Sequence, residues 1–182
     1  MNHYASNTFG PNLDFDVTLE KGKQFEDLVE PLINQYFGSL DPNAMYMNKA
    51  YSKKDIKHGR GQRYKSCVNP NISFSAPDIE MHCLGKQLHV EIKYKERWVN
   101  FQGKEYGIVD EYRIQHYKDV LDVTNFDACL IVFGCGTTRK VYIVNVNDYI
   151  KKKLPFMRTD RNNPTCTFAC WDVEKMKCIG SF

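Results

Sequence analysis

The stretch Pro77–Lys95, PDIEMHCLGKQLHVEIKYK, alternates between apolar and polar residues and decides the fold. Leu84-Gly85-Lys86-Gln87 is typical of a tight turn between two short strands, with Gly85-Lys86 as its two-residue loop. This turn predicts that the six apolar side chains of the hairpin meet in pairs: Cys83 with Leu88, Met81 with Val90, and Ile79 with Ile92. Because side chains alternate across a strand, we expect these six to share one face that packs on the core.

The other face of the hairpin collects charged and polar groups. It is predicted to carry Asp78, Glu80 and His82 opposite Lys93, Glu91 and His89. Carboxylates on neighbouring strands repel one another, and a close pair is costly to ionise without a cation. A divalent metal with a preference for oxygen ligands, Mg²⁺ or Mn²⁺, would relieve that repulsion. The alternative is a hairpin whose charged face is simply solvated.

Pro77-Asp78, followed on the next strand by Glu91-Ile92-Lys93, resembles the motif of the PD-(D/E)xK nuclease superfamily, which has the restriction-endonuclease-like fold. The resemblance implies that Asp78, Glu91 and the carbonyl of Ile92 bind Mg²⁺ or Mn²⁺. It also implies that Lys93 positions the attacking water and stabilises the charge that develops on the scissile phosphate.

A helix is predicted from about Leu19 to Gly38, with Thr18 as its N-cap and with a bend or restart at Pro31. Its apolar residues form two adjacent rows, Phe25, Leu28, Leu32 and Tyr36 in one, and Leu19, Val29 and Ile33 in the other. Glu26 falls in this stripe, where a carboxylate is costly unless it is paired, metal-bound or at the edge. Many superfamily members have a metal-binding glutamate on the first core helix, so the resemblance adds Glu26 to the catalytic and metal-binding set. A glutamate that reaches solvent from the helix flank is the alternative.

The segment Lys49–Lys65, KAYSKKDIKHGRGQRYK, is strongly basic and precedes the hairpin. A nucleic-acid backbone is the natural partner of such a segment, although charge runs are often only solvated surface. The candidate contacts are Lys53, Lys54, Lys57, Arg60, Arg63 and Lys65. Ile72–Ser75 alternates and is predicted to be a strand that leads into the hairpin.

Beyond the hairpin, Glu96–Gly107 is predicted to be a loop that lines the substrate cleft, or whose aromatic side chains cap the core. A helix follows from about Val109, and its buried side is predicted to consist of Ile114, Tyr117, Val120 and Leu121. Superfamily members often place polar residues of this helix at the site, so the resemblance makes Gln115 a catalytic candidate, beside Tyr112, and Arg113 a phosphate contact. The Gln-x-x-x-Tyr motif of the RecB and lambda-exonuclease branch is not met, because Asp119 stands in place of the tyrosine.

The C-terminal part continues with Ala128–Phe133, an apolar run that predicts a strand buried on both faces, and with a further strand at Val141–Val144. Asn147–Lys153 is predicted to be a short helix and Thr165–Trp171 an edge strand; residues 173–182 have no assignment. The predicted fold is therefore a single α/β domain with a central mixed sheet flanked by helices. Its α-β-β-β-α-β order matches the core of the nuclease superfamily.

Composition supports one globular domain, since 42% of the 182 residues are hydrophobic and 26% are charged. The net charge of +3 does not by itself predict a nucleic-acid partner. No secretory signal or membrane-length apolar run is visible, and the odd number of 7 cysteines favours reduced thiols, so we expect a cytoplasmic protein, of a host cell if the chain is viral. Cys166, Cys170 and Cys178 form the only cysteine cluster, and its spacing matches no metal-ligand pattern.

These features together predict a Mg²⁺-dependent deoxyribonuclease, structure-selective or general rather than sequence-specific, and an endonuclease. Three alternatives stay open: an RNA endonuclease, a nucleic-acid-binding protein of the same fold without catalysis, and a Zn²⁺ or Fe²⁺ protein that uses His82, His89, Glu80 and Glu91. Holliday-junction resolvases and restriction enzymes of this superfamily are usually dimers, so a homodimer is also open. No dimer surface is evident in the sequence.

Overall fold

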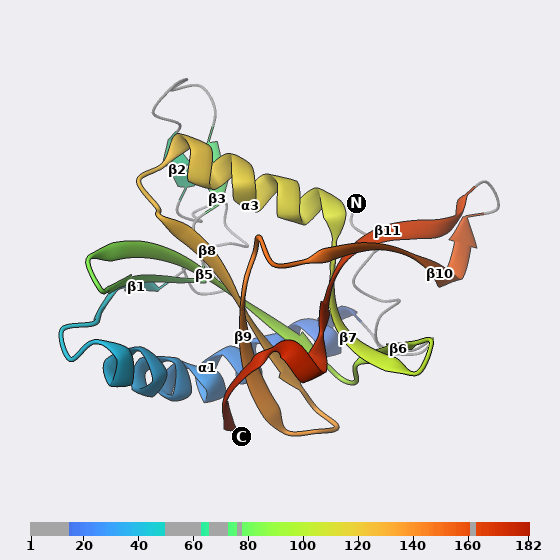
Figure 1. The fold of residues 1–182 in the computed structure, drawn as a ribbon, viewed down its shortest axis with the longest axis horizontal. Helices are drawn as coiled ribbons and strands as arrows, with labels where there is room; N and C mark the ends of the chain where they lie inside the picture. The colour runs from blue at the N-terminus through green and yellow to red at the C-terminus, as the bar shows by residue number, and fades with distance from the viewer. Residues whose placement is uncertain (1–14, 50–62, 66–72, 76–77, 161–162) are drawn as a thin grey trace.

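A computed structural model describes residues 15–49, 63–65, 73–75, 78–160 and 163–182 of the chain (Figure 1). The first half of the described chain contains α1 (Phe15–Leu40), β1 (Met45–Lys49), β2 (Arg63–Lys65), β3 (Ser73–Ser75), β4 (Ile79–Cys83), β5 (Lys86–Lys95), β6 (Val99–Phe101) and β7 (Lys104–Asp110). The second half contains α3 (Glu111–Val123), β8 (Ala128–Cys135), β9 (Lys140–Asn145), β10 (Ile150–Asp160), β11 (Asn163–Asp172), the short 3-10 helix η2 (Val173–Lys175) and β12 (Lys177–Ser181).

A six-stranded mixed sheet in the order β1-β4-β5-β8-β9-β12 forms the centre of the molecule. Only β5 and β8 pair in parallel, because the chain between them crosses over through α3; the other neighbours are antiparallel. A four-stranded sheet, β10-β11-β7-β6, and the short pair β2-β3 complete the strands described. The prediction of an α/β protein with a central mixed sheet is confirmed at this level.

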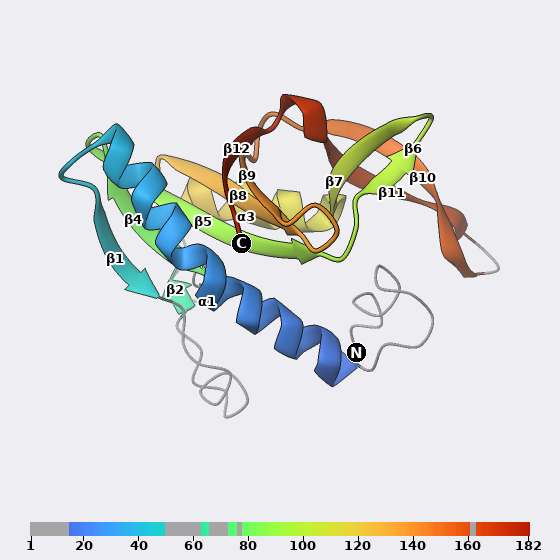
Figure 2. The same cartoon turned by 90° about the horizontal axis from the view of Figure 1, so that it is seen from below.

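The two helices cover opposite faces of the central sheet, as Figures 1 and 2 show. On β8, Val132 belongs to the core that packs on α1, whereas Ile131 and Phe133 belong to the core that packs on α3. Both sets are buried, so the prediction that this apolar run is a strand buried on both faces is confirmed.

The β4–β5 hairpin turns one residue earlier than predicted. Leu84 and Gly85 form the two-residue loop, both with positive φ (52° and 73°), which is the conformation that two-residue hairpin loops favour. The resulting pairs are Cys83 with Lys86, Met81 with Leu88, and Ile79 with Val90. For each residue of β4, the predicted partner on β5 lies two positions beyond the partner that the structure shows. Because a displacement of two leaves every side chain on its own face, the predicted faces are nevertheless confirmed.

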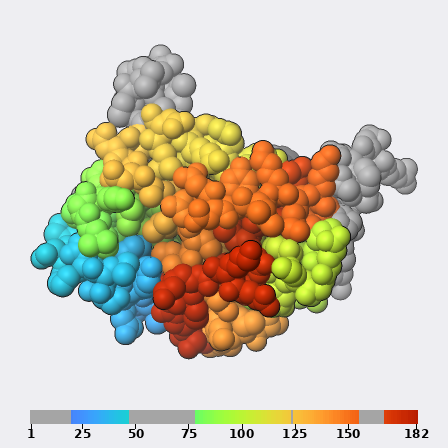
Figure 3. All heavy atoms as spheres, in the orientation of Figure 1, coloured from blue at the N-terminus to red at the C-terminus, as the bar shows by residue number. Residues whose placement is uncertain are grey.

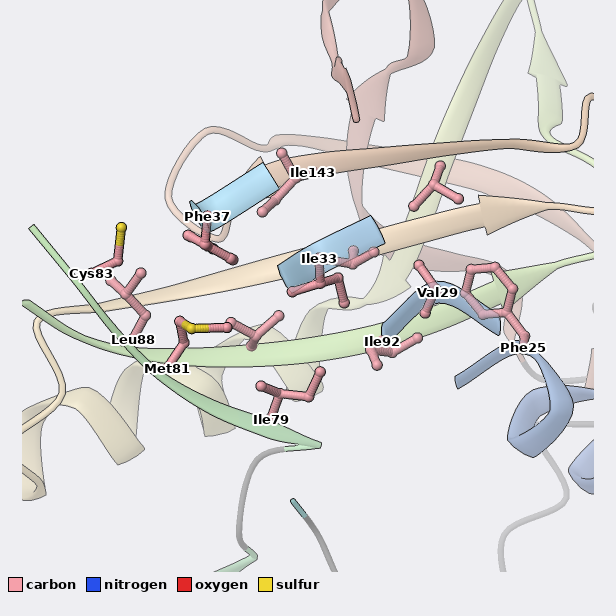
Figure 4. Close-up of a cluster of buried hydrophobic side chains, with 13 residues drawn as sticks. Phe25, Val29, Ile33, Phe37, Ile79, Met81, Cys83, Leu88, Ile92 and Ile143 are labelled. Atoms are coloured by element: carbon pink, nitrogen blue, oxygen red, sulfur yellow. The ribbon is translucent and has the colours of Figure 1, made fainter. Parts of the chain in front are cut away.

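The apolar face of this hairpin packs on α1 in one core cluster (Figure 4). From α1 the buried residues are Phe25, Val29, Ile33 and Phe37, one for each turn of the helix. From the hairpin, all six apolar side chains are buried: Ile79, Met81, Cys83, Leu88, Val90 and Ile92. Leu28 was predicted to lie in the apolar row that faces the core, and this prediction is wrong, because Leu28 is 55% exposed.

α1 begins at Phe15, earlier than predicted, and runs for 26 residues to Leu40. Thr18 therefore lies inside the helix and is not its N-cap. Pro31 neither ends the helix nor restarts it, and Pro31 is exposed. Proline removes one backbone hydrogen bond, and on the exposed side the carbonyl that it leaves free can bond to water.

The main errors of the sequence-based prediction lie in the four-stranded sheet. Glu96–Gly107 is no loop, since it contains β6 and most of β7, and the predicted helix Asn147–Lys153 lies in a turn and in β10. β11 pairs with β10 on one side and with β7 on the other, so it is not an edge strand. The tail that had no assignment forms η2 and β12, which pairs with β9.

The first strand of the central sheet also differs from the prediction. It is β1, which the sequence pattern missed and which pairs with β4. The strand predicted at Ile72–Ser75 appears as β3, but it pairs with β2 outside the central sheet. No helix within the described ranges combines the length and apolarity that a membrane span requires.

Gly134→Ala is expected to destabilise the protein by about 1–3 kcal/mol. A Cβ at Gly134 in β8 would overlap the ring of Phe25, which is itself buried against the sheet. Gly22→Ala is the matched control, because a Cβ there meets open space on α1 and alanine stabilises a helix interior by roughly 0.5–1 kcal/mol. Chemical denaturation of both variants measures the two opposite shifts, and equal shifts would contradict this packing.

Candidate active site on the face of β5 toward α3

β5 carries a row of polar side chains, His89, Glu91, Lys93 and Lys95, at alternate positions. His89 and Glu91 contact Tyr117 of α3, so this row faces α3 while the apolar residues between them face α1. Around His89 and Glu91 the predicted polar face of the hairpin is therefore covered by α3, while its other polar side chains are half-buried.

Glu91 is the centre of a buried hydrogen-bond network. Its Oε1 lies 2.8 Å from Nε2 of His89, and its Oε2 accepts hydrogen bonds from Nζ of Lys93 at 2.8 Å and from the hydroxyl of Tyr117 at 3.3 Å. Burial alone would raise the pKa of Glu91, but the attraction of Lys93 and the hydrogen bond from His89 outweigh it and hold the pKa well below its usual range. Glu91 is therefore ionised at neutral pH.

Lys93 is held in its charged form by the same contacts. Burial lowers the pKa of a lysine, yet the attraction of Glu91, with smaller contributions from Tyr117 and Asp78, raises the pKa of Lys93 well above its usual value. An ammonium with such a pKa donates hydrogen bonds and stabilises negative charge. It does not act as a proton acceptor at neutral pH.

Asp78 precedes β4, and its carboxylate extends the hairpin by one hydrogen bond. Its Oδ2 accepts from the backbone N–H of Ile92 at 2.7 Å, just beyond the last backbone pair of the hairpin, Ile79 with Val90. Burial and repulsion by Glu91 outweigh the attraction of Lys93 and raise the pKa of Asp78 to about 7. Asp78 is thus a partly buried carboxylate that is attracted mainly by Lys93 among the described residues, and Lys93 is already paired with Glu91.

Glu26 of α1 lies close enough to Asp78 for its charge to add to this increase in pKa. The predicted acidic residues Glu26, Asp78 and Glu91 thus influence one another across α1 and the hairpin. Within the described residues, however, no three His, Cys, Asp or Glu side chains are arranged as a complete metal site. The carbonyl of Ile92 as a ligand stays a prediction.

The donor set nevertheless fits Mg²⁺ or Mn²⁺. Mg²⁺ is commonly bound by one or two carboxylates, with waters and substrate phosphates in its other positions. Asp78 and Glu91 supply two carboxylates, and the unbalanced charge of Asp78 is the kind of cost that a divalent cation removes. Glu26 would then contribute from α1, directly or through a bound water.

α3 contributes a different residue from the one predicted. Gln115 is exposed and its amide donates to Asp119 of the same helix at 2.8 Å, so the structure does not bring it to Glu91. Tyr117, which was assigned only to the core, is buried and reaches Glu91 with its hydroxyl. The sequence could have identified Tyr117 as a site residue, because a tyrosine on the buried side of a helix brings a hydroxyl group that needs a hydrogen-bond partner. A substrate contact of Gln115 stays a prediction.

Tyr117→Phe is expected to slow any reaction that depends on Glu91 about tenfold, because the loss of one hydrogen bond to an ionised group is worth roughly 1.5–3 kcal/mol at most and Glu91 keeps its other partners. Gln115→Ala is the matched substitution on the exposed side of α3 and is expected to change the rate less than twofold. Single-turnover rates of the two variants distinguish the helix face that serves the site. A larger effect at Gln115 would restore the prediction made from the sequence.

Most of the predicted nucleic-acid contacts cannot be placed. Lys53, Lys54, Lys57 and Arg60 lie outside the described residues, and of Arg63 and Lys65 only the backbone, in β2, is described. Arg113 is partly buried in the first turn of α3, with its Nε 3.8 Å from Asp110 and 3.2 Å from the hydroxyl of Tyr112, which is exposed.

The alternative metal site of histidines and carboxylates receives no support from the described residues. His89 is 1% exposed and packs between the rings of Tyr117 and Phe126, with Nε2 committed to Glu91. His82 is cross-strand to Gln87. Among the clustered cysteines, Cys170 is buried in β11 and Cys178 is exposed on β12, both as free thiols, and the side chain of Cys166 is outside the description.

Comparison of the chain with family models, with curated proteins and with solved structures finds no match.

Proposed function

We propose that this protein is a metal-dependent nuclease that hydrolyses DNA phosphodiester bonds, with its active site on the face of β5 toward α3. The observation that carries the proposal is the arrangement of Asp78, Glu91 and Lys93. One carboxylate, Glu91, is balanced by the ammonium of Lys93, and the other, Asp78, has no ion pair of its own among the described residues. Such a set suits a divalent metal and an anionic substrate together.

We further propose that α1, β1, β4, β5, α3 and β8 form a core of the restriction-endonuclease-like type. Their order along the chain is α-β-β-β-α-β, the three strands β1, β4 and β5 are consecutive antiparallel neighbours, and β8 joins β5 in parallel. The position of the two helices on opposite faces agrees with this assignment. The insertion of β6 and β7 before α3 is a feature of this chain.

The roles of the side chains follow from their charges. Asp78 and Glu91 would hold the metal, and Glu26 would assist from α1, directly or through water. Lys93 donates a hydrogen bond to the attacking water or to the scissile phosphate and stabilises the negative charge that grows there. His89 and Tyr117 fix the orientation of Glu91. A bound Mg²⁺ would supply a Lewis acid and a water of lowered pKa.

The proposal is tested by Mg²⁺-dependent cleavage of linear, circular and branched DNA and of RNA. Lys93→Ala is compared with Lys86→Ala, an exposed lysine at the other end of the same strand. We expect Lys93→Ala to reduce the rate at least a hundredfold and Lys86→Ala to leave it unchanged. Cleavage that persists in Lys93→Ala removes the proposal, whereas binding of DNA by the wild type without any cleavage indicates a binding protein of the same fold.

Mg²⁺ is expected to raise the melting temperature more at pH 8 than at pH 5. A ligand that binds only the folded state stabilises it, and protons compete with the metal for Asp78, whose pKa is raised to about 7 by burial and by Glu91. Thermal melting at matched ionic strength, with and without Mg²⁺, measures the difference. In Asp78→Asn the shift should disappear, and a shift of equal size at both pH values and in that variant would contradict a metal at Asp78.

A further inference from the structure

A second cationic group lies next to the proposed site, at the end of β5. Lys95 follows Lys93 on the face toward α3, and Arg113 lies in the first turn of that helix. Lys95 lies close enough to Lys93 and to Arg113 for the charge of each to disfavour the charged form of Lys95. The three cations form a positively charged cluster, Lys93-Lys95-Arg113, that continues the row of site residues along the strand.

Lys95 differs from its two neighbours because its charge is poorly balanced. Lys93 has an ion pair with Glu91, and Arg113 lies beside Asp110. Lys95 forms no ion pair with any described residue and is only attracted at longer range by Asp110, which it shares with Arg113. Burial, with repulsion by Lys93 and Arg113, outweighs that attraction and lowers the pKa of Lys95 to about 8.

The polar face of the hairpin therefore has a poorly balanced charge of each sign. Within the described chain, Asp78 is attracted mainly by Lys93, which Glu91 already balances, and Lys95 forms no ion pair. A divalent metal would balance only the first. A phosphodiester chain that arrives with the metal would balance both, because it carries negative charge at every nucleotide.

We propose that Lys95 and Arg113 bind a second backbone phosphate, the neighbour of the scissile phosphate along the same nucleic-acid strand. Lys93 and Lys95 are two residues apart on an extended strand, which separates their Cα atoms by about 7 Å. This separation is comparable to that of successive phosphates in one strand of a nucleic acid. One lysine can thus serve the scissile phosphate while the other, with the guanidinium of Arg113, serves the next.

That the bound phosphate is the neighbour of the scissile one rests on the proposed function, but phosphate binding by Lys95 and Arg113 can be measured without cleavage. The full chain is titrated, with EDTA present, into a fluorescently labelled DNA duplex and an RNA duplex of the same sequence over a range of salt concentrations. Lys95→Gln and Arg113→Gln are each compared with Lys86→Gln, the exposed lysine at the opposite end of β5.

We expect each of the first two variants to bind about five- to tenfold more weakly and to lower the slope of log K against log salt by about 1. Lys86→Gln should match the wild type. Lys95→Arg should restore the slope, because it restores the charge, and this rescue distinguishes a phosphate contact from a structural effect. The melting temperature of each variant reports its folding, and removal of an unbalanced, partly buried ammonium should not lower it.

An unchanged salt slope in Lys95→Gln, or no binding of either duplex by the wild type, overturns this inference. A tighter complex with the DNA duplex than with the RNA duplex, or the reverse, identifies the source of the phosphate. If the wild type binds with the expected slopes but does not cleave, the proposed function fails while the phosphate site stands. If it cleaves, Lys95→Gln should raise KM and leave kcat nearly unchanged.

Discussion

Asp78→Asn is expected to abolish Mg²⁺-dependent cleavage and to raise the melting temperature at alkaline pH. The amide keeps the shape of the side chain and an oxygen that can accept from the N–H of Ile92. It removes the negative charge that burial and Glu91 disfavour. Cleavage should fall at least a hundredfold, because the metal loses one of its two carboxylates.

The sign of the stability change depends on pH. In the folded protein, burial and repulsion by Glu91 raise the pKa of Asp78 from 3.8 to about 7, so between these values the folded state binds more protons than the unfolded state. Ionisation of Asp78 therefore costs the folded protein nothing below pH 4. As the pH rises from 4 towards 7, this cost lowers the free energy of unfolding by at most about 1.4 kcal/mol for each pH unit. Above pH 7 the full cost remains, and Asp78→Asn removes it.

Melting curves from pH 4 to pH 9 without metal measure this effect. The variant and the wild type should melt at similar temperatures near pH 4 and should diverge above it, with the variant more stable. Asp122→Asn, the same substitution at an exposed position of α3, is the control and should show no divergence. A variant that is less stable than the wild type at pH 8 would show that Asp78 is not under electrostatic strain.

Glu91→Gln is expected to abolish cleavage and to destabilise the protein by roughly 3–5 kcal/mol, the reverse of the effect on stability at Asp78. The ammonium of Lys93 would lose the carboxylate that balances it, and His89 would lose a charged hydrogen-bond partner. Because the folded-state pKa of Glu91 lies below its unfolded value of 4.5, its stabilising effect is present at neutral pH and is lost as the pH falls below that value.

A double-mutant cycle separates the ion pair from the remaining contacts of Glu91. Glu91→Gln, Lys93→Met and the double variant are compared by chemical denaturation, with Glu105→Gln as the exposed control. The double variant should recover part of the stability that Glu91→Gln loses, since the buried ammonium is then gone. Strictly additive losses would mean that Glu91 and Lys93 contribute independently, against the 2.8 Å contact.

The hairpin and its charged face could be predicted because the alternation of apolar and polar residues assigns the two faces correctly even when the turn is misplaced by one residue. A period of two assigns each residue to a face, and a turn misplaced by one residue shifted the pairing by two without exchanging the faces. For the same reason Asp78, Glu91 and Lys93 were identified correctly as neighbours. β8 was predicted because an apolar run between polar residues indicates a strand buried on both sides.

The four-stranded sheet could not be predicted because its strands are stabilised by distant partners. In β10, Lys152 lies over the rings of Phe101 and Tyr106, with Nζ 5.2 Å and 4.6 Å from their centroids. A lysine that packs on aromatic rings looks like a solvated residue in the sequence, so the three consecutive lysines of this strand favoured a basic helix. Lys151 pairs with Glu111, and in Figure 3 β10 and α3 are adjacent on the surface.

The contribution of α3 to the site was predicted in outline but with the wrong side chain. Gln115 and Tyr117 are two residues apart, and at 3.6 residues per turn they point to nearly opposite sides of the helix. Ile114 and Val120 fix which side is buried, and Tyr117 belongs to it. The apolar pattern had already placed Tyr117 correctly, but a buried tyrosine was taken as core alone, and its hydroxyl was not considered as a partner for Glu91.

The parallel pairing of β5 with β8 has a consequence for synthesis of the chain. The β4–β5 hairpin is local and can form as soon as it leaves the ribosome, whereas β8 must wait for the whole crossover through α3. Until then Asp78, Glu91 and Lys93 remain in water, where their charges cost little and no buried site exists. A nascent chain that ends before β8 should therefore carry the complete motif without the buried site, so the proposed nuclease activity would arise only after β8 has been synthesised.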